Sequence, residues 1–262
     1  MSLWRSSNPM MNENVFKNEG QAVSSAETMS IAGTVNKTAM LTGFLLLGAT
    51  WVWHLFYSNG GGNAVTMQQG AQAAMPWMLG GIIGGLILAL ITTFKPGIAF
   101  ITAPIYAVLQ GLALGGISAF AQAKFPNNPI VIQAVALTIG VLVSMLAAYR
   151  FGLVKATARF RTGLMAAGMA LCAVYLVTFV LSFFSIQVPY IHDAGLIGIG
   201  FSLVAVTIAS LFLVLDFDFV EQGVAAGAPK SMEWYAAFSL LVTLVWVYLE
   251  ILRLLQKLNS KR

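Results

Sequence analysis

Long intervals without a charged side chain constrain this sequence more than any other feature. No Asp, Glu, Lys or Arg occurs between Lys37 and Lys95, and five further gaps of this kind follow along the chain. Most of them reach the roughly 20 residues that an α-helix needs to cross a bilayer. Only 9% of the residues are charged, against roughly 25% in soluble domains. The chain is therefore predicted to be an all-α, polytopic membrane protein.

The apolar stretches predict seven membrane-spanning helices in a bundle. They cover residues 38–57, 75–94, 98–121, 130–149, 164–184, 194–215 (or a few residues more) and 234–255. The sequence then divides into a polar N-terminal tail (1–36), a seven-helix transmembrane domain (37–258) and a short basic C-terminal tail (259–262). The N-terminal tail lacks apolar periodicity, so we expect it to be mobile.

The net charge of +5 comes mainly from basic residues between the predicted spans, so it does not indicate nucleic-acid binding. Counted by side, the basic residues favour the side that holds the N-terminus and the dense loop 150–163. Short loops rich in Lys and Arg stay in the cytoplasm, which predicts a cytoplasmic N-terminus. The basic C-terminal tail disagrees with this count, and the side of the C-terminus stays open.

Small residues recur at four-residue spacing inside the predicted spans. The pairs are Gly80 with Gly84, Gly81 with Gly85, and Gly111 with Gly115. This spacing lets helices approach closely in a bilayer. Tight packing within one chain is the favoured interpretation, a dimer face is the alternative, and the oligomeric state stays open.

The carboxylates outside the N-terminal tail gather near the C-terminal end of the chain. Only Asp193 precedes the group Asp216, Asp218, Glu221, Glu233 and Glu250. An ionisable group in or beside a membrane span is expensive, so each of these is a functional candidate by default.

Asp216 directly follows the apolar run of the sixth span, and Asp218 lies two residues on. Two residues correspond to about 200° of helix rotation, so the two carboxylates face opposite ways. One interpretation is that both mark the end of a helix. The alternative is that one of them faces the bundle, where it would bind a cation, a proton or a basic partner.

Glu250 lies well inside the seventh span, with Arg253 three and Lys257 seven residues later. This spacing allows a local ion pair, which is the simplest interpretation. The alternative is a buried carboxylate that responds to pH and gates a cation path. Thr243 lies two helical turns before Glu250 on the same face.

The motifs of the common enzyme classes are absent from the sequence. It contains no HExxH, Walker loop, GxSxG or Cys/His metal spacing, so we expect neither enzymatic activity nor a cofactor. No lysine lies in the interior of a predicted span, which removes the attachment point of a retinal Schiff base.

Several local patterns resemble the Bax inhibitor (TMBIM) superfamily, in its bacterial YccA-like branch. The first span opens NKTAMLTGFLLLGA, the third contains AVLQGLALGGI and the fourth IQAVALTIGVLVSMLAAY. The sixth ends LFLVLDFDFV, and the seventh contains AAFSL and then YLEILRLL. Their order and spacing cover nearly the whole chain from Asn36 onward.

The resemblance implies a seven-helix bundle in which the last helix is central and the other six wrap it. It also implies a pH-sensitive calcium leak controlled by two aspartates of the sixth and seventh helices. Asp216 matches the first aspartate. Alignment on AAFSL places Thr243 at the second, whereas alignment on the Tyr-Leu-acidic pattern places Glu250 there.

These observations predict a leak for cations, with calcium as the permeant ion, in a bacterial inner membrane. Asp216 is the expected gating carboxylate and Glu250 its expected partner, and both would contact calcium transiently. Asp218 and Glu233 would attract cations at the mouth. Two alternatives remain: a regulatory protein that binds a membrane protease or another partner through its N-terminal tail, and a proton-coupled carrier of small solutes.

Overall fold

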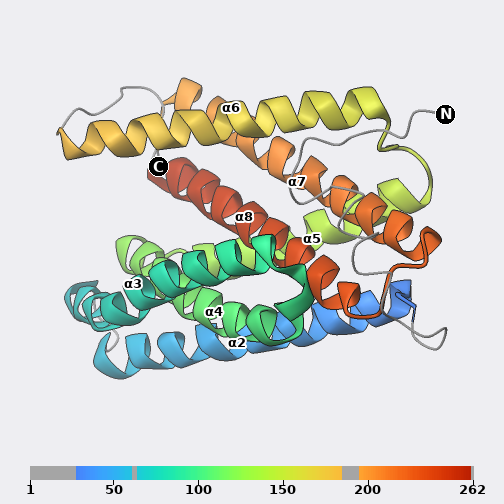
Figure 1. Cartoon of the computed structure of the whole chain (residues 1–262). Helices are drawn as coiled ribbons and strands as arrows, with labels where there is room; N and C mark the ends of the chain where they lie inside the picture. Colours follow the sequence, from blue (N-terminus) through green and yellow to red (C-terminus); the bar gives the residue numbers. More distant parts are fainter. Residues whose placement is uncertain (1–27, 61–63, 185–194, 261–262) are drawn as a thin grey trace. The chain divides into compact units, whose positions relative to one another are not determined.

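The computed structural model describes residues 28–60, 64–184 and 195–260, and these residues form helices joined by short connections (Figure 1). Within these ranges seven helices are long and apolar enough to cross a membrane. This confirms the predicted seven-helix membrane bundle. The long helices are α2 (Ile31–Gly60), α3 (Ala64–Phe94), α4 (Ala99–Lys124), α5 (Ile130–Arg150), α6 (Ala158–Phe183), α7 (Leu196–Ala225) and α8 (Met232–Ser260), and a short 3₁₀ helix, η3 (Pro96–Ile98), joins α3 to α4.

Several helices are longer than the predicted spans. α2 begins at Ile31, inside the segment expected to be a tail, and residues 1–27 of that tail lie outside the described residues. α3 begins at Ala64, because the uncharged stretch before residue 75 is rich in Ala and Gln, which are good helix formers. α6 begins at Ala158, where the Thr157 side chain accepts a hydrogen bond from the Phe160 N–H and caps the helix.

The length of α7 changes the interpretation of Asp216 and Asp218. The helix continues to Ala225, nine residues beyond Asp216, so Asp216 and Asp218 do not mark a helix end. That interpretation of the sequence was wrong. A helix can continue past the edge of its apolar stretch when its last turns face headgroups or water, because only the apolar stretch has to match the bilayer.

The chain divides into two compact units, which we describe separately. The first contains the described residues up to Pro126 together with Asp218–Leu241, and the second contains Asn127–Phe217 together with the chain from Val242 on. α7 and α8 therefore contribute to both units. α8 is also the most enclosed helix: 56% of its most apolar stretch is buried, against 11% for α5. The resemblance implies this enclosure for the last helix.

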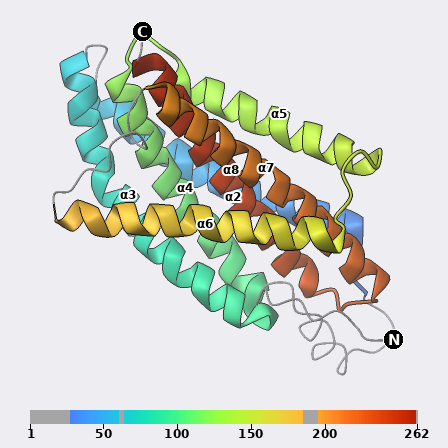
Figure 2. The ribbon, with the colours of Figure 1, turned by 90° about the horizontal axis from the view of Figure 1, so that it is seen from above.

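In the first unit, α2, α3 and α4 lie side by side (Figures 1 and 2). Glycines set their separation, because a Cβ atom at Gly111 would lie 2.1 Å from the Leu45 carbonyl oxygen and one at Gly81 would lie 2.4 Å from the Leu109 carbonyl oxygen. Backbones that approach this closely gain packing contacts that lipid cannot supply. The predicted packing role of Gly81 and Gly111 is therefore confirmed.

In the second unit, aromatic side chains of α7 contact the neighbouring helices. The Phe217 ring lies 5.8 Å from the Tyr149 ring of α5, and the Phe212 ring lies 5.3 Å from the Trp246 ring of α8. Gly168 of α6 leaves room for Phe212, since a Cβ atom there would lie 2.7 Å from that ring. These contacts fix α7 among α5, α6 and α8.

Gly81 and Gly80 are adjacent on α3 but differ in their surroundings. A Cβ atom at Gly81 meets the α4 backbone, whereas one at Gly80 has nothing within 4 Å. We expect Gly81→Ala to lower the free energy of unfolding by about 1–3 kcal/mol through overpacking. Gly80→Ala should leave it unchanged or raise it by up to ~1 kcal/mol through helix propensity. Thermal unfolding in detergent, followed by circular dichroism, measures both, and equal melting temperatures would contradict the packing role.

Candidate functional site

The residues singled out from the sequence are nearly all enclosed by protein. Asp216 and Thr243 are each 7% exposed, and Glu233 and Glu250 are each 1% exposed. Asp218 is half-buried. Carboxylates that are removed from water in an apolar bundle need compensating partners, so the partners of each one indicate its role.

Contacts in the second unit define how α7 and α8 face each other. The Phe212 ring packs on the Trp246 ring, and the Lys257 Nζ donates hydrogen bonds to the Gly198 carbonyl oxygen (2.9 Å) and the Ser202 Oγ (2.8 Å). Later residues of α7 therefore face earlier residues of α8. The two helices run antiparallel along this segment.

This register decides which residue of α8 lies level with Asp216. Phe212 of α7 faces Trp246 of α8. Because the helices are antiparallel, Asp216, four residues after Phe212, lies at the same height as the residue four positions before Trp246, which is next to Thr243. Glu250 lies about eight residues further along α8, which is ~12 Å at 1.5 Å per residue. The geometry brings Asp216 to the level of Thr243 and not to that of Glu250.

Asp216 and Asp218 differ in burial, as their rotation on one helix predicts. Asp216 is buried, whereas Asp218 is half-buried and its Oδ2 accepts a hydrogen bond of 2.7 Å from the Gln222 side chain one turn later. Asp218 is the more accessible of the two, and the Gln222 side chain that donates to it belongs to the same helix.

Glu250 is held by side chains of α6 and α8. Its carboxylate accepts hydrogen bonds from the Tyr175 hydroxyl (2.9 Å), the Trp246 indole (3.2 Å) and Arg253 Nη1 (3.0 and 3.1 Å). The Arg253 guanidinium also lies 4.5 Å from the centre of the Tyr175 ring, a cation–π distance. The local ion pair expected from the sequence is present, and Tyr175 extends it to a second helix.

Lys257, which the sequence offered with Arg253 as a neighbour of Glu250, also forms hydrogen bonds to α7. Its side chain is buried, and its hydrogen bonds to Gly198 and Ser202 fix the end of α8 to the start of α7. A lysine near the end of an apolar helix predicts a side chain that reaches out to water. These α7 acceptors could not be predicted from the sequence, because they lie 55 and 59 residues from Lys257.

Glu233 is placed in the first turn of α8 and belongs to the first unit. Its carboxylate forms an ion pair with Lys37 of α2 and accepts hydrogen bonds from Ser30. The sequence suggested a carboxylate open to cations at the mouth of the bundle. In the structure Glu233 is instead buried, and the Lys37 ammonium is its ion-pair partner.

The described residues contain no group of three or more His, Cys, Asp or Glu side chains that could hold a metal ion.

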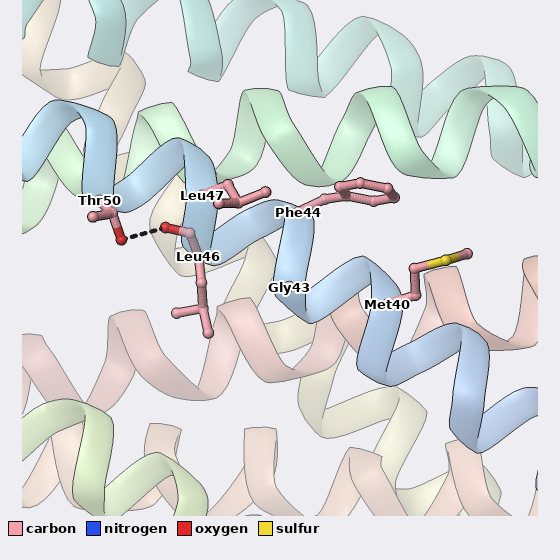
Figure 3. Close-up of a pocket in the computed structure, with 6 residues that line it drawn as sticks. All are labelled: Met40, Gly43, Phe44, Leu46, Leu47 and Thr50. Atoms are coloured by element: carbon pink, nitrogen blue, oxygen red, sulfur yellow. Dashed lines mark hydrogen bonds between the residues drawn. The ribbon is translucent and has the colours of Figure 1, made fainter.

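A shallow apolar depression lies on one face of α2 (Figure 3). It is lined by Met40, Gly43, Phe44, Leu46, Leu47 and Thr50. The Thr50 hydroxyl donates to the Leu46 carbonyl oxygen (2.7 Å), and Leu47 is 67% exposed. Such an open, apolar face on a membrane-spanning helix fits contact with lipid.

The fold and its enclosed carboxylates define a class: a polytopic α-helical membrane protein with ionisable side chains buried on its last two helices. Within that class, the chain belongs to the Bax inhibitor 1 like family, which it matches over residues 8–260. This confirms the superfamily inferred from the sequence patterns. The searches of curated proteins and of solved structures each gave no match.

The register of α7 and α8 can be tested by cross-linking in a background in which the single cysteine is replaced, Cys172→Ser. We expect Asp216→Cys with Thr243→Cys to form a disulfide on mild oxidation. Asp216→Cys with Glu250→Cys should not, because an axial offset of ~12 Å far exceeds the Cα separation of at most about 7 Å that a direct disulfide allows. Gel mobility with and without reductant reports the product. A cross-link only in the second pair would contradict the antiparallel register.

Proposed function

We propose that this protein is a pH-sensitive leak for cations, of the Bax inhibitor type, with calcium as the favoured permeant ion. The observation that carries the proposal is the position of Asp216: a buried carboxylate directly after the charge-free stretch of α7, on a helix that continues to Ala225. Membership of the Bax inhibitor 1 like family supports it. We place the protein in the bacterial YccA-like branch and in the inner membrane, with a cytoplasmic N-terminus.

Asp216 and Thr243 would contact the ion during its passage. Hard cations such as calcium bind carboxylate and hydroxyl oxygens, and the register of α7 and α8 brings one of each to the same level. A proton and a cation both relieve the charge of a buried carboxylate. They therefore compete for Asp216, and this competition would make the leak depend on pH.

Glu250 is the alternative partner of Asp216 in this proposal. Its carboxylate is occupied by Tyr175, Trp246 and Arg253 and lies ~12 Å along the axis from the level of Asp216. Thr243 is therefore the preferred partner, and Glu250 would act by fixing α8 against α6. Asp218 would attract cations to the entrance, because it is the more accessible aspartate.

No enzymatic activity and no cofactor enter this proposal. The two other hypotheses make different predictions for the same protein. A regulatory protein that binds its partner through the N-terminal tail would show no intrinsic leak, and a proton-coupled carrier would show saturable, stereospecific uptake of a solute.

The proposal is tested by calcium influx into liposomes that contain the purified protein, at several pH values around neutrality. We expect wild-type flux to change with pH and Asp216→Asn to give a flat profile, since a carboxamide does not titrate. Asp218→Asn is the matched control on the same helix: it should lower the amplitude and keep the pH dependence. Thr243→Val should reduce flux more than Glu250→Gln does.

Two results would contradict the proposal. Wild-type flux equal to that of empty liposomes at every pH would exclude the leak and favour the partner-binding hypothesis. A pH profile that is the same in the wild type and in Asp216→Asn would remove Asp216 from the mechanism. An equal loss of pH dependence in Glu250→Gln would make Glu250 the partner.

A further inference from the structure

The residues just before α2 lie against the residues just before α8, within the first unit. Thr28 pairs with Pro229 in an antiparallel bridge, and the Met29 N–H donates a hydrogen bond of 2.7 Å to the Ala228 carbonyl oxygen. We call residues 28–30 the strap. It joins the N-terminal end of the first helix to the turn between α7 and α8.

Glu233 fastens the strap from the first turn of α8. Its Oε1 accepts hydrogen bonds from the Ser30 backbone N–H (2.9 Å) and from the Ser30 hydroxyl (3.0 Å), and its Oε2 pairs with the Lys37 Nζ. Ser30 Oγ in turn accepts from the Gly33 N–H (2.9 Å). One carboxylate therefore lies at the N-terminal ends of α2 and α8 together, where the helix dipoles favour negative charge.

A glycine of α2, Gly33, leaves space for the Glu233 carboxylate. A Cβ atom at Gly33 would lie 2.1 Å from Glu233 Oε1 and 2.4 Å from its Cδ, so any larger residue there would push the carboxylate out of this position. The Lys37 ammonium lies 5.5 Å from the centre of the Trp234 ring, which adds a cation–π contact. Glu233 is 1% exposed and the Lys37 side chain 17%, so water reaches the pair poorly.

The turn held by the strap joins the two helices on which the proposed leak depends. It follows α7, which carries Asp216, and leads into α8, which carries Thr243. In the conformation described here Asp216 is buried, which is the state expected of a closed leak. Contacts that exist in one state and are lost in another shift the population toward the first.

We propose that the strap, fastened by Glu233, Lys37 and Ser30, is an autoinhibitory contact that holds the turn between α7 and α8 in the closed conformation. This inference rests on the proposed leak. Loss of the Glu233 charge, or displacement of residues 28–30 by a ligand of the N-terminal tail, releases the turn and raises the flux.

The first test compares Glu233→Gln with wild type in the liposome assay. We expect Glu233→Gln to raise the initial calcium flux by roughly tenfold, equivalent to about 1.4 kcal/mol in the closed–open equilibrium. Gly33→Ala should raise it too, because it displaces the carboxylate and leaves both charges in place. Glu221→Gln, which neutralises an exposed carboxylate of α7, is the matched control and should leave the flux unchanged.

A disulfide across the strap tests the same contact in the opposite direction. The hydrogen bond from Met29 to Ala228 makes Thr28 and Pro229 a non-hydrogen-bonded pair, in which Cα atoms lie about 4.5 Å apart, within disulfide range. In the Cys172→Ser background, oxidised Thr28→Cys/Pro229→Cys should suppress the extra flux of Glu233→Gln, and reductant should restore it. If Glu233→Gln does not fold, the oxidised pair in otherwise wild-type protein should lower flux below that of its reduced form.

Hydrogen exchange provides a readout that does not depend on flux. Backbone amides of residues 29–34 should exchange faster in Glu233→Gln than in wild type. Faster exchange with unchanged flux, in a wild-type protein that leaks, would overturn the strap and leave the leak in place. If neither wild type nor Glu233→Gln leaks at any pH, the proposed function and the strap both fail.

Discussion

Pairing of buried carboxylates with cations is the interaction on which the rest of this structure depends. Bringing one ionised carboxylate out of water costs several kcal/mol unless a partner compensates for it. α8 carries two such groups, each 1% exposed: Glu233 near its start, paired with Lys37, and Glu250 near its end, paired with Arg253. Each carboxylate also accepts a hydrogen bond from a hydroxyl outside α8, Glu233 from Ser30 and Glu250 from Tyr175. The most enclosed helix is thus fixed by charge at its two ends and by apolar packing between them.

This arrangement gives the acidic residues of α8 a structural role. The two carboxylates of α8 are engaged in joining helices, so the level of Thr243 between them is free of acidic side chains on α8 itself. The carboxylate at that level comes from α7, as Asp216. In the proposed leak, Asp216 would respond to protons while the ion pairs of Glu233 and Glu250 keep α8 in place.

The number and order of the helices followed from the sequence, because apolar stretches of membrane length are unambiguous. Helix ends were harder to predict from the sequence. α7 continues beyond Asp216 to Ala225, because a change in composition marks the edge of the membrane and not the end of a helix. Pairs within one helix were also predictable, as Glu250 with Arg253 shows. The partners Tyr175 and Lys37 were not, because they lie 75 and 196 residues from the carboxylates they bind. Only the packing of the folded chain brings them together.

The contact between Ser30 and Glu233 spans 203 residues of sequence, and this has a consequence for how the protein is made. A chain inserted into a membrane from its N-terminus exposes the start of α2 first and the start of α8 last. The strap therefore remains unfastened until the seventh helix has been synthesised, and its closure marks the completion of the bundle. The contact also requires both helix starts to lie on one side of the membrane. An even number of crossings between the two helix starts, as the six long helices α2 to α7 would provide, satisfies this requirement.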